Sequence, residues 1–206
     1  EKDLGVSLSS QYYSLLPYYK EGDNLYFFLF FKISSTELKL NYYELNIISR
    51  DIKIKGNTTF VPKIYYSSSS FVQDIFGPSC QILLTTEPEQ KNVLACFYIV
   101  TNPQYLQSVV FDIENNFKEL SEYSKFKSEP EKEYIKSLAY KDKSKAFICY
   151  AKSNGKCLTY DMNSKNFSES LGVISSCSLN YQAIFLNYFK ATDEYVFRCV
   201  NNEGLI

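Results

Sequence analysis

Four short strand cores recur along this chain, and that repetition restricts its fold more than any other feature. Each core has six residues and follows a polar turn: NLYFFL (24–29), NVLACF (92–97), KAFICY (145–150) and EYVFRC (194–199). The last three cores carry Cys at matching places, 53 and 50 residues apart, at positions 96, 149 and 199. A period near 50 residues with several short strands per unit is typical of β-propeller blades. The sequence therefore predicts an all-β chain of blade-like units, with a β-sandwich as the alternative.

Residues that favour strands dominate the apolar runs, whereas the helical signal is weak. Tyr and Phe, with 19 and 16 copies, recur there with Val, Ile and Thr, which suit a pleated, half-buried surface. Polar turns at 21–24, 153–156 and 191–193 separate the runs, and Asn154-Gly155 is the clearest hairpin signal. The predicted strands are 25–33, 38–47, 82–86, 92–100, 107–113, 135–140, 146–151, 156–161, 183–189 and 194–200.

These strands predict one all-β repeat domain over residues 1–206. About four blade-like units are expected, at roughly 10–60, 61–120, 121–170 and 171–206. Because the sequence ends at Ile206, just after a hairpin and within a unit, we expect these residues to be part of a longer propeller. The stretch from Phe117 to Lys145 is heavily charged, and we expect a solvated loop or one short helix there rather than a binding site.

The absence of His excludes several classes of functional site. Without imidazole there is no Ser-His-Asp or Cys-His pair and no His-ligated zinc. The seven Gly residues are never closer than 17 positions apart, which excludes a phosphate-binding glycine loop. We therefore expect no catalysis, metal or cofactor. The remaining enzymatic alternative is a glycosidase with Asp112 and Asp161 as its two carboxylates, although turn formation explains both residues more simply.

Charge and hydropathy restrict the partners in the same way. With 22 basic and 23 acidic side chains, the net charge of −1 gives no electrostatic basis for nucleic-acid binding. The longest strongly apolar stretch, 25–31, stops at Lys32 and is far shorter than the roughly 20 residues of a membrane helix. We expect a protein partner, with neither nucleic acid nor a membrane span.

The six Cys residues lack the spacing of a zinc or redox motif. They predict either buried thiols of a cytosolic protein or three disulfides in an oxidising compartment. The repeat favours disulfides, because each Cys on a repeated core has one further Cys near it in the sequence with which it could pair. Sequence alone permits 15 connectivities, and the most local set is the predicted one. The predicted pairs are Cys80–Cys96, Cys149–Cys157 and Cys177–Cys199.

The composition adds a resemblance to this picture. Lys greatly outnumbers Arg, and Trp is absent. The residues Tyr, Phe, Ile, Asn and Ser are abundant, and this composition is typical of proteins from AT-rich genomes. With its Cys-bearing hairpins, the chain resembles secreted and surface proteins of apicomplexan parasites, some of which carry disulfide-bearing propellers. AT-rich large DNA viruses encode secreted immune modulators of similar composition. The resemblance implies an extracellular, host-facing role. Two N-glycosylation sequons, at Asn57 and Asn166 in predicted turns, fit a secreted chain.

Four Tyr-Tyr doublets indicate where such a protein binds. Neighbouring side chains of a strand point to opposite faces, so each doublet is expected to direct one Tyr outward, as interfaces often use it. Cross-strand pairing that only stabilises the sheet is the alternative. The predicted binding residues are Tyr12, Tyr13, Tyr18, Tyr19, Tyr42, Tyr43, Tyr65 and Tyr66.

The combined features predict a non-enzymatic, secreted or cell-surface module that binds a host surface protein in adhesion, receptor binding or immune evasion. A structural propeller scaffold within a larger complex is the alternative.

Overall fold

The computed structural model of this chain is built from antiparallel β-strands, which confirms the predicted all-β class. No helix occurs in the residues that it describes, and the repeated cores lie in strands. The described residues are 13–62, 75–86, 89–100, 105–120, 124–127, 135–139, 142–151, 155–174, 181–189, 191–192 and 194–201.

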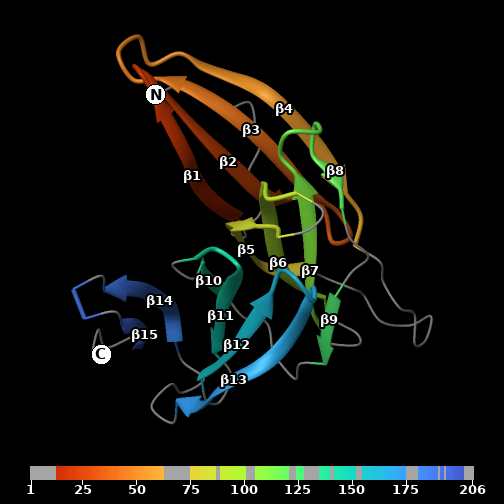
Figure 1. Ribbon diagram of the computed structural model, residues 1–206, viewed down its shortest axis with the longest axis vertical. Helices are drawn as coiled ribbons and strands as arrows, with labels where there is room; N and C mark the ends of the chain where they lie inside the picture. The colour runs from red at the N-terminus through yellow and green to blue at the C-terminus, as the bar shows by residue number, and fades with distance from the viewer. Residues whose placement is uncertain are drawn as a thin grey trace.

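The first half of the chain forms two sheets in which strands pair in chain order (Figure 1). Sheet 1 consists of β1 (Tyr13–Glu21), β2 (Asn24–Lys32), β3 (Leu38–Asn46) and β4 (Ile52–Phe60). Sheet 2 consists of β5 (Ile75–Leu84), β6 (Asn92–Val100), β7 (Tyr105–Asp112), β8 (Lys118–Glu119) and β9 (Ser124–Lys127). Both β8 and β9 pair with β7, along different parts of its length.

The second half forms two further sheets, a four-stranded meander and a two-stranded hairpin. Sheet 3 consists of β10 (Ile135–Ala139), β11 (Lys145–Ala151), β12 (Gly155–Asp161) and β13 (Asn166–Ile174). Sheet 4 consists of β14 (Tyr181–Phe189) and β15 (Glu194–Asn201). The four repeated cores all fall on the second strand of their sheet, namely β2, β6, β11 and β15.

The charged stretch between Phe117 and Lys145 differs from its prediction. Its described part contains β8, β9 and β10 and no helix, and of these only β10 was expected as a strand. The edge strands β4 and β13 were also missed, as was β1. Side chains of β4 are mostly exposed or half-buried, so β4 lacks the apolar run that marks a central strand. In β1, Pro17 interrupts the pattern and lies beside a register shift.

Consecutive sheets pack face to face, and this explains the long apolar runs of the central strands. On β6, the side chains of Val93, Ala95, Phe97 and Ile99 join a core with sheet 3, whereas Leu94, Cys96, Tyr98 and Val100 join a core with sheet 1. Because both faces of β6 are covered, nearly all of its residues are buried and apolar. Sheet 3 in turn packs Phe147, Cys149 and Cys157 against Leu186 of sheet 4.

The first strands of the four sheets are neighbours in space: β1 contacts β5, β5 contacts β10, and β10 contacts β14. Side chains join these strands. The Gln81 carboxamide donates to Ser137 O (2.7 Å) and accepts from Ala139 N (3.3 Å), so it takes the place of a backbone partner for β10. Similarly, Ser14 Oγ accepts a hydrogen bond from Cys80 N at 3.1 Å. The first strands of the four sheets therefore form one continuous row.

Candidate binding surface

The structure places the predicted tyrosines in different environments. Tyr13 and Tyr19 are exposed, by 55% and 44%, whereas Tyr18 and Tyr42 are half-buried and Tyr43 is fully buried. In the 42–43 doublet, Tyr42 is therefore the accessible member, and Tyr43 packs in a core with Phe27, Leu29 and Phe31. Tyr12, Tyr65 and Tyr66 lie outside the described residues.

The doublet at positions 18 and 19 does not alternate as expected. The register between β1 and β2 shifts between Pro17 and Tyr19, so the two tyrosines turn to the same face of sheet 1. Their rings contact each other edge to face at 4.9 Å between centroids. Tyr18 also packs against Phe28, and Tyr19 stacks on Tyr26 at 4.4 Å. The expectation of one inward and one outward ring is therefore wrong for this doublet, because a bulge adds a residue.

Four tyrosines gather on that face, and we call them the tyrosine cluster: Tyr18, Tyr19, Tyr26 and Tyr42. Tyr42 contacts Tyr18 and Tyr26 at 6.3 and 6.0 Å between centroids and stacks on Phe28. Tyr26 was not among the predicted residues. It lies in the repeated core of β2, opposite Tyr19 on β1, and this pairing is visible only once the register is known.

Charged groups border the cluster. The Tyr26 hydroxyl donates to Glu44 Oε2 (3.3 Å), and Lys55 Nζ lies 3.1 Å from the same oxygen. The hydrogen bond from Lys55 holds the pKa of Glu44 below its usual value. Burial raises the pKa of Tyr42, and burial followed by the Glu114 carboxylate raises that of Tyr18. These phenols therefore stay neutral at physiological pH and keep their hydrogen-bond donors.

The cluster packs against Phe117, which belongs to the turn between β7 and β8 of sheet 2. The Phe117 ring contacts Phe28 and Tyr42, each at 5.9 Å between centroids, and is itself 5% exposed. Gly56 of β4 faces this ring so closely that an added Cβ would lie 2.8 Å from Phe117 Cε2. The turns at this end of sheet 1 point away from sheets 3 and 4 (Figure 1).

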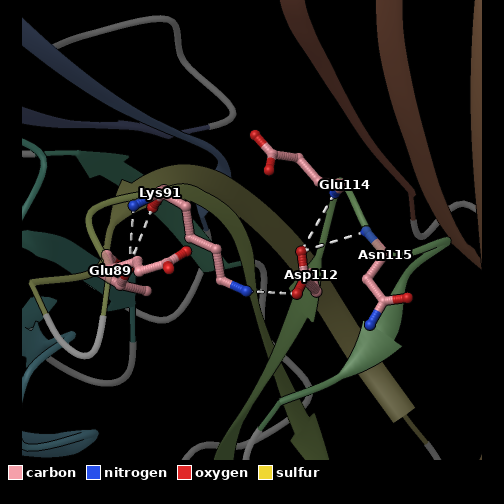
Figure 2. A network of polar contacts seen from close by, with 6 residues as sticks. Glu89, Lys91, Asp112, Glu114 and Asn115 are labelled. Atoms are coloured by element: carbon pink, nitrogen blue, oxygen red, sulfur yellow. Dashed lines mark hydrogen bonds and ion pairs between the residues drawn. The ribbon is translucent and has the colours of Figure 1, made fainter.

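Asp112 and Asp161, the two candidate carboxylates, act as turn formers. Oδ1 of Asp112 accepts hydrogen bonds from the backbone N–H groups of Glu114 and Asn115, at 3.2 and 3.3 Å (Figure 2). Oδ1 of Asp161 accepts from the two corresponding N–H groups of its own turn, at 2.8 and 3.3 Å. Each pairs with a Lys: Lys91, just before β6, lies 2.5 Å from Asp112, and Lys145, the first residue of β11, lies 3.3 Å from Asp161.

These side-chain-capped turns, which we call corners, also occur in sheet 1, where an Asn takes the place of the Asp. Asn46 ends β3, and its Oδ1 accepts from the N–H groups two and three residues on, at 3.1 and 2.9 Å. Asn24 takes the place of the Lys, as its Oδ1 accepts from Asn46 Nδ2 at 2.9 Å. The residue four positions after Asn46, Asp112 or Asp161 has a left-handed backbone. These residues are Arg50, Asn116 and Lys165, with φ of 61°, 49° and 54°.

The buried corner at Asp112 gives a prediction about acid stability. The hydrogen bond from Lys91 lowers the pKa of Asp112, so this carboxylate stabilises the fold fully above about pH 5 and loses its effect as the pH falls through that pKa. Asp112→Asn keeps the turn, as Asn46 does, but loses the ion pair. We expect it to lower the free energy of unfolding by on the order of 1–2 kcal/mol at pH 7.

Urea denaturation of both proteins from pH 7 to pH 3 tests this expectation. The difference between wild type and Asp112→Asn should shrink as the pH falls. Asp161→Asn is the matched control, because the Lys145–Asp161 pair is more exposed and should contribute less. A difference for Asp112→Asn that stays constant over this range would contradict the assignment.

Two of the three predicted disulfides are confirmed. Cys80–Cys96 joins β5 to β6, and Cys149–Cys157 joins β11 to β12, each with Cα atoms 4.1 Å apart. All four Cys side chains are buried. The bridges differ in placement, since Cys96 bonds to the first strand of its sheet and Cys149 to the third. The pair Cys177–Cys199 falls partly outside the described residues and stays a prediction.

The sequon residues are exposed but do not lie in the expected turns. Asn57 is within the edge strand β4, and Asn166 is the first residue of β13. Among the described residues, no group of three or more Cys, Asp or Glu side chains could hold a metal ion. Over the same ranges, the structure has no helix with the length and apolar character needed to cross a membrane.

Comparison of the chain with family models, curated proteins and solved structures gives no match in any of the three.

Proposed function

We propose that this chain is a non-enzymatic module that binds a protein partner through the tyrosine cluster of sheet 1. The observation that carries the proposal is the grouping of four tyrosines on one face, with Tyr19 exposed and Tyr18 and Tyr42 half-exposed. Tyr offers a large apolar body with a polar tip and few rotatable bonds, and it is enriched at protein interfaces. The neutral phenols and the Glu44–Lys55 pair beside them would supply a polar rim.

We further propose that the four sheets are blades of a β-propeller. Three features support this: each larger sheet is a meander in chain order, consecutive sheets stack face to face, and their first strands form one row. In a propeller, the first strands line the central channel, and one end of the blades carries the binding surface. The turns that follow the first and third strands of a meander lie at the same end, and the tyrosine cluster is beside them in sheet 1.

The same proposal places the protein outside the cell, secreted or at the cell surface, in a host-facing role. Two disulfides are compatible with an extracellular location, because such bonds persist mainly in oxidising compartments. The exposed sequon residues Asn57 and Asn166 are accessible to glycosylation. A mobility shift on treatment of the secreted protein with a glycosidase would support this location.

The matched pair Tyr19→Ala and Tyr13→Ala tests the binding surface. Both residues are exposed on β1, but Tyr19 stacks on Tyr26 whereas Tyr13 is paired with Phe31, whose side chain belongs to the core on the other face. The wild-type protein is first used to identify a partner among host surface proteins. We expect Tyr19→Ala to weaken its binding by about 1–3 kcal/mol, which is roughly 5- to 150-fold in Kd, and Tyr13→Ala to leave it unchanged.

Thermal denaturation of both variants checks that the fold is retained. Equal affinities for wild type and Tyr19→Ala, with Tyr42→Ala also unchanged, would contradict the surface and favour a scaffold role.

A further inference from the structure

A pocket of about 600 Å³ opens between sheets 2 and 3, at the end where their turns lie. Thr85, Thr86 and Lys91 line it from the connection between β5 and β6, and Asn163 and Lys165 line it from the turn between β12 and β13. Leu120 and Met162 complete the lining and supply its apolar part. This volume is within the range of small-molecule sites.

Asn163 and Lys165 bring hydrogen-bond donors to the lining of the pocket. Thr86 Oγ1 donates to Asn163 Oδ1 at 2.6 Å and so joins the two sheets across the opening. This bond occupies the amide oxygen and leaves the Asn163 amide N–H groups as donors. Thr85 holds the loop itself, since its Oγ1 donates to Glu89 O (2.6 Å) and accepts from Lys91 N (3.1 Å).

Two of the three lysine side chains at the pocket and its turns are paired with a carboxylate. The Lys91 ammonium is neutralised by Asp112 beside it (Figure 2), and Lys145 is neutralised by Asp161. Lys165 makes no ion pair among the described residues, and the described part of the lining contains no carboxylate side chain. An anion is the natural ligand for a cation beside amide N–H donors.

At the interface between sheets 1 and 2, the space that corresponds to this pocket is filled by side chains. Between sheets 1 and 2, the corresponding turn of sheet 2 places Phe117 against Phe28 and Tyr42 and closes the gap with aromatic rings. The turn of sheet 3 instead presents Asn163 and Lys165 to the pocket. The corner of sheet 2 therefore supports aromatic packing against sheet 1, whereas the corner of sheet 3 places polar groups around an open pocket beside sheet 2.

We propose that this pocket binds a small organic oxyanion, a phosphate or carboxylate. Lys165 and Asn163 would hold the anionic group, and Leu120 and Met162 would contact the apolar part. This site is separate from the tyrosine cluster and does not depend on the proposed protein partner.

Titration of the full 15N-labelled chain by NMR tests the proposal, with phenyl phosphate, benzoate and inorganic phosphate as probes. We expect saturable shifts of the N–H signals of residues 85–86, 91 and 162–165. Saturation by phenyl phosphate alone assigns a phosphate group, and saturation by benzoate as well assigns oxyanions in general. If none of the three probes gives saturable shifts at these residues, the proposal is wrong.

A pair of charge-removing variants provides the control. Lys165→Asn keeps a residue suited to the left-handed backbone, as Asn116 is in sheet 2, and should raise Kd about tenfold or more. Arg50→Asn removes one positive charge from the corresponding position of sheet 1 and should leave Kd unchanged. Retained 15N–1H dispersion shows that both variants fold. Equal effects of the two variants, or no effect of Lys165→Asn, would overturn the site.

Discussion

Phe117→Ala is expected to lower the free energy of unfolding by about 3–5 kcal/mol, the largest effect of any single substitution considered for this protein. The ring is 5% exposed and joins sheet 2 to sheet 1 through Phe28 and Tyr42. Its removal leaves a cavity between two sheets whose backbones are each held by their own strand pairing, so the space cannot close fully. Urea denaturation of the oxidised protein measures the loss.

Gly56→Ala tests the same contact from the opposite side. An added Cβ would lie 2.8 Å from the Phe117 ring, so we expect a cost of about 1–3 kcal/mol from overpacking. In the Phe117→Ala background the ring is absent, and Gly56→Ala should then cost little. A double-mutant cycle measures this coupling, and strictly additive costs would show that Phe117 does not lie on Gly56.

Loss of the two disulfides is the second large effect that we expect. Their Cys residues are separated by 16 and 8 positions, and chain-entropy loss in the unfolded state predicts stabilisation of roughly 3 and roughly 2.5 kcal/mol. The double replacement of Cys80 and Cys96 by Ala should therefore cost slightly more than that of Cys149 and Cys157. Together the bridges would contribute a large part of the 5–15 kcal/mol typical of a folded domain.

Denaturation of the two double variants in parallel measures these costs, and non-reducing peptide mapping checks the pairing first. Recovery of any of these four Cys residues as a free thiol in the native protein would contradict the assignment. An unchanged free energy of unfolding after both replacements would show that the bridges do not stabilise the fold.

The strand cores and the local disulfides could be predicted because both depend on neighbours along the chain. A second strand covered on both faces, such as β6, must be apolar at almost every position, and that run is visible in the sequence. Cys149 and Cys157 are only 8 positions apart around a hairpin turn, so their pairing follows from the strand register. The edge strand β4 has no such run, because solvent permits polar residues there.

The repeated corner was partly visible for a similar reason. Asp112 and Asp161 share a recognisable polar turn, and their role in capping it depends on residues two and three positions away. Asn46 performs the same role with different flanking residues, so only the backbone geometry shows that sheet 1 has this corner too.

The candidate sites depended on contacts between distant parts of the chain, and only the tertiary structure decided them. A bulge beside Pro17 turned Tyr18 and Tyr19 to one face, and the register of β1 with β2 added Tyr26 to their cluster. The pocket near Lys165 exists because two sheets, joined by Thr86 and Asn163 across 77 positions of sequence, meet at one edge. Alternation and periodicity describe one strand at a time, whereas these surfaces are set by how strands and sheets are placed against one another.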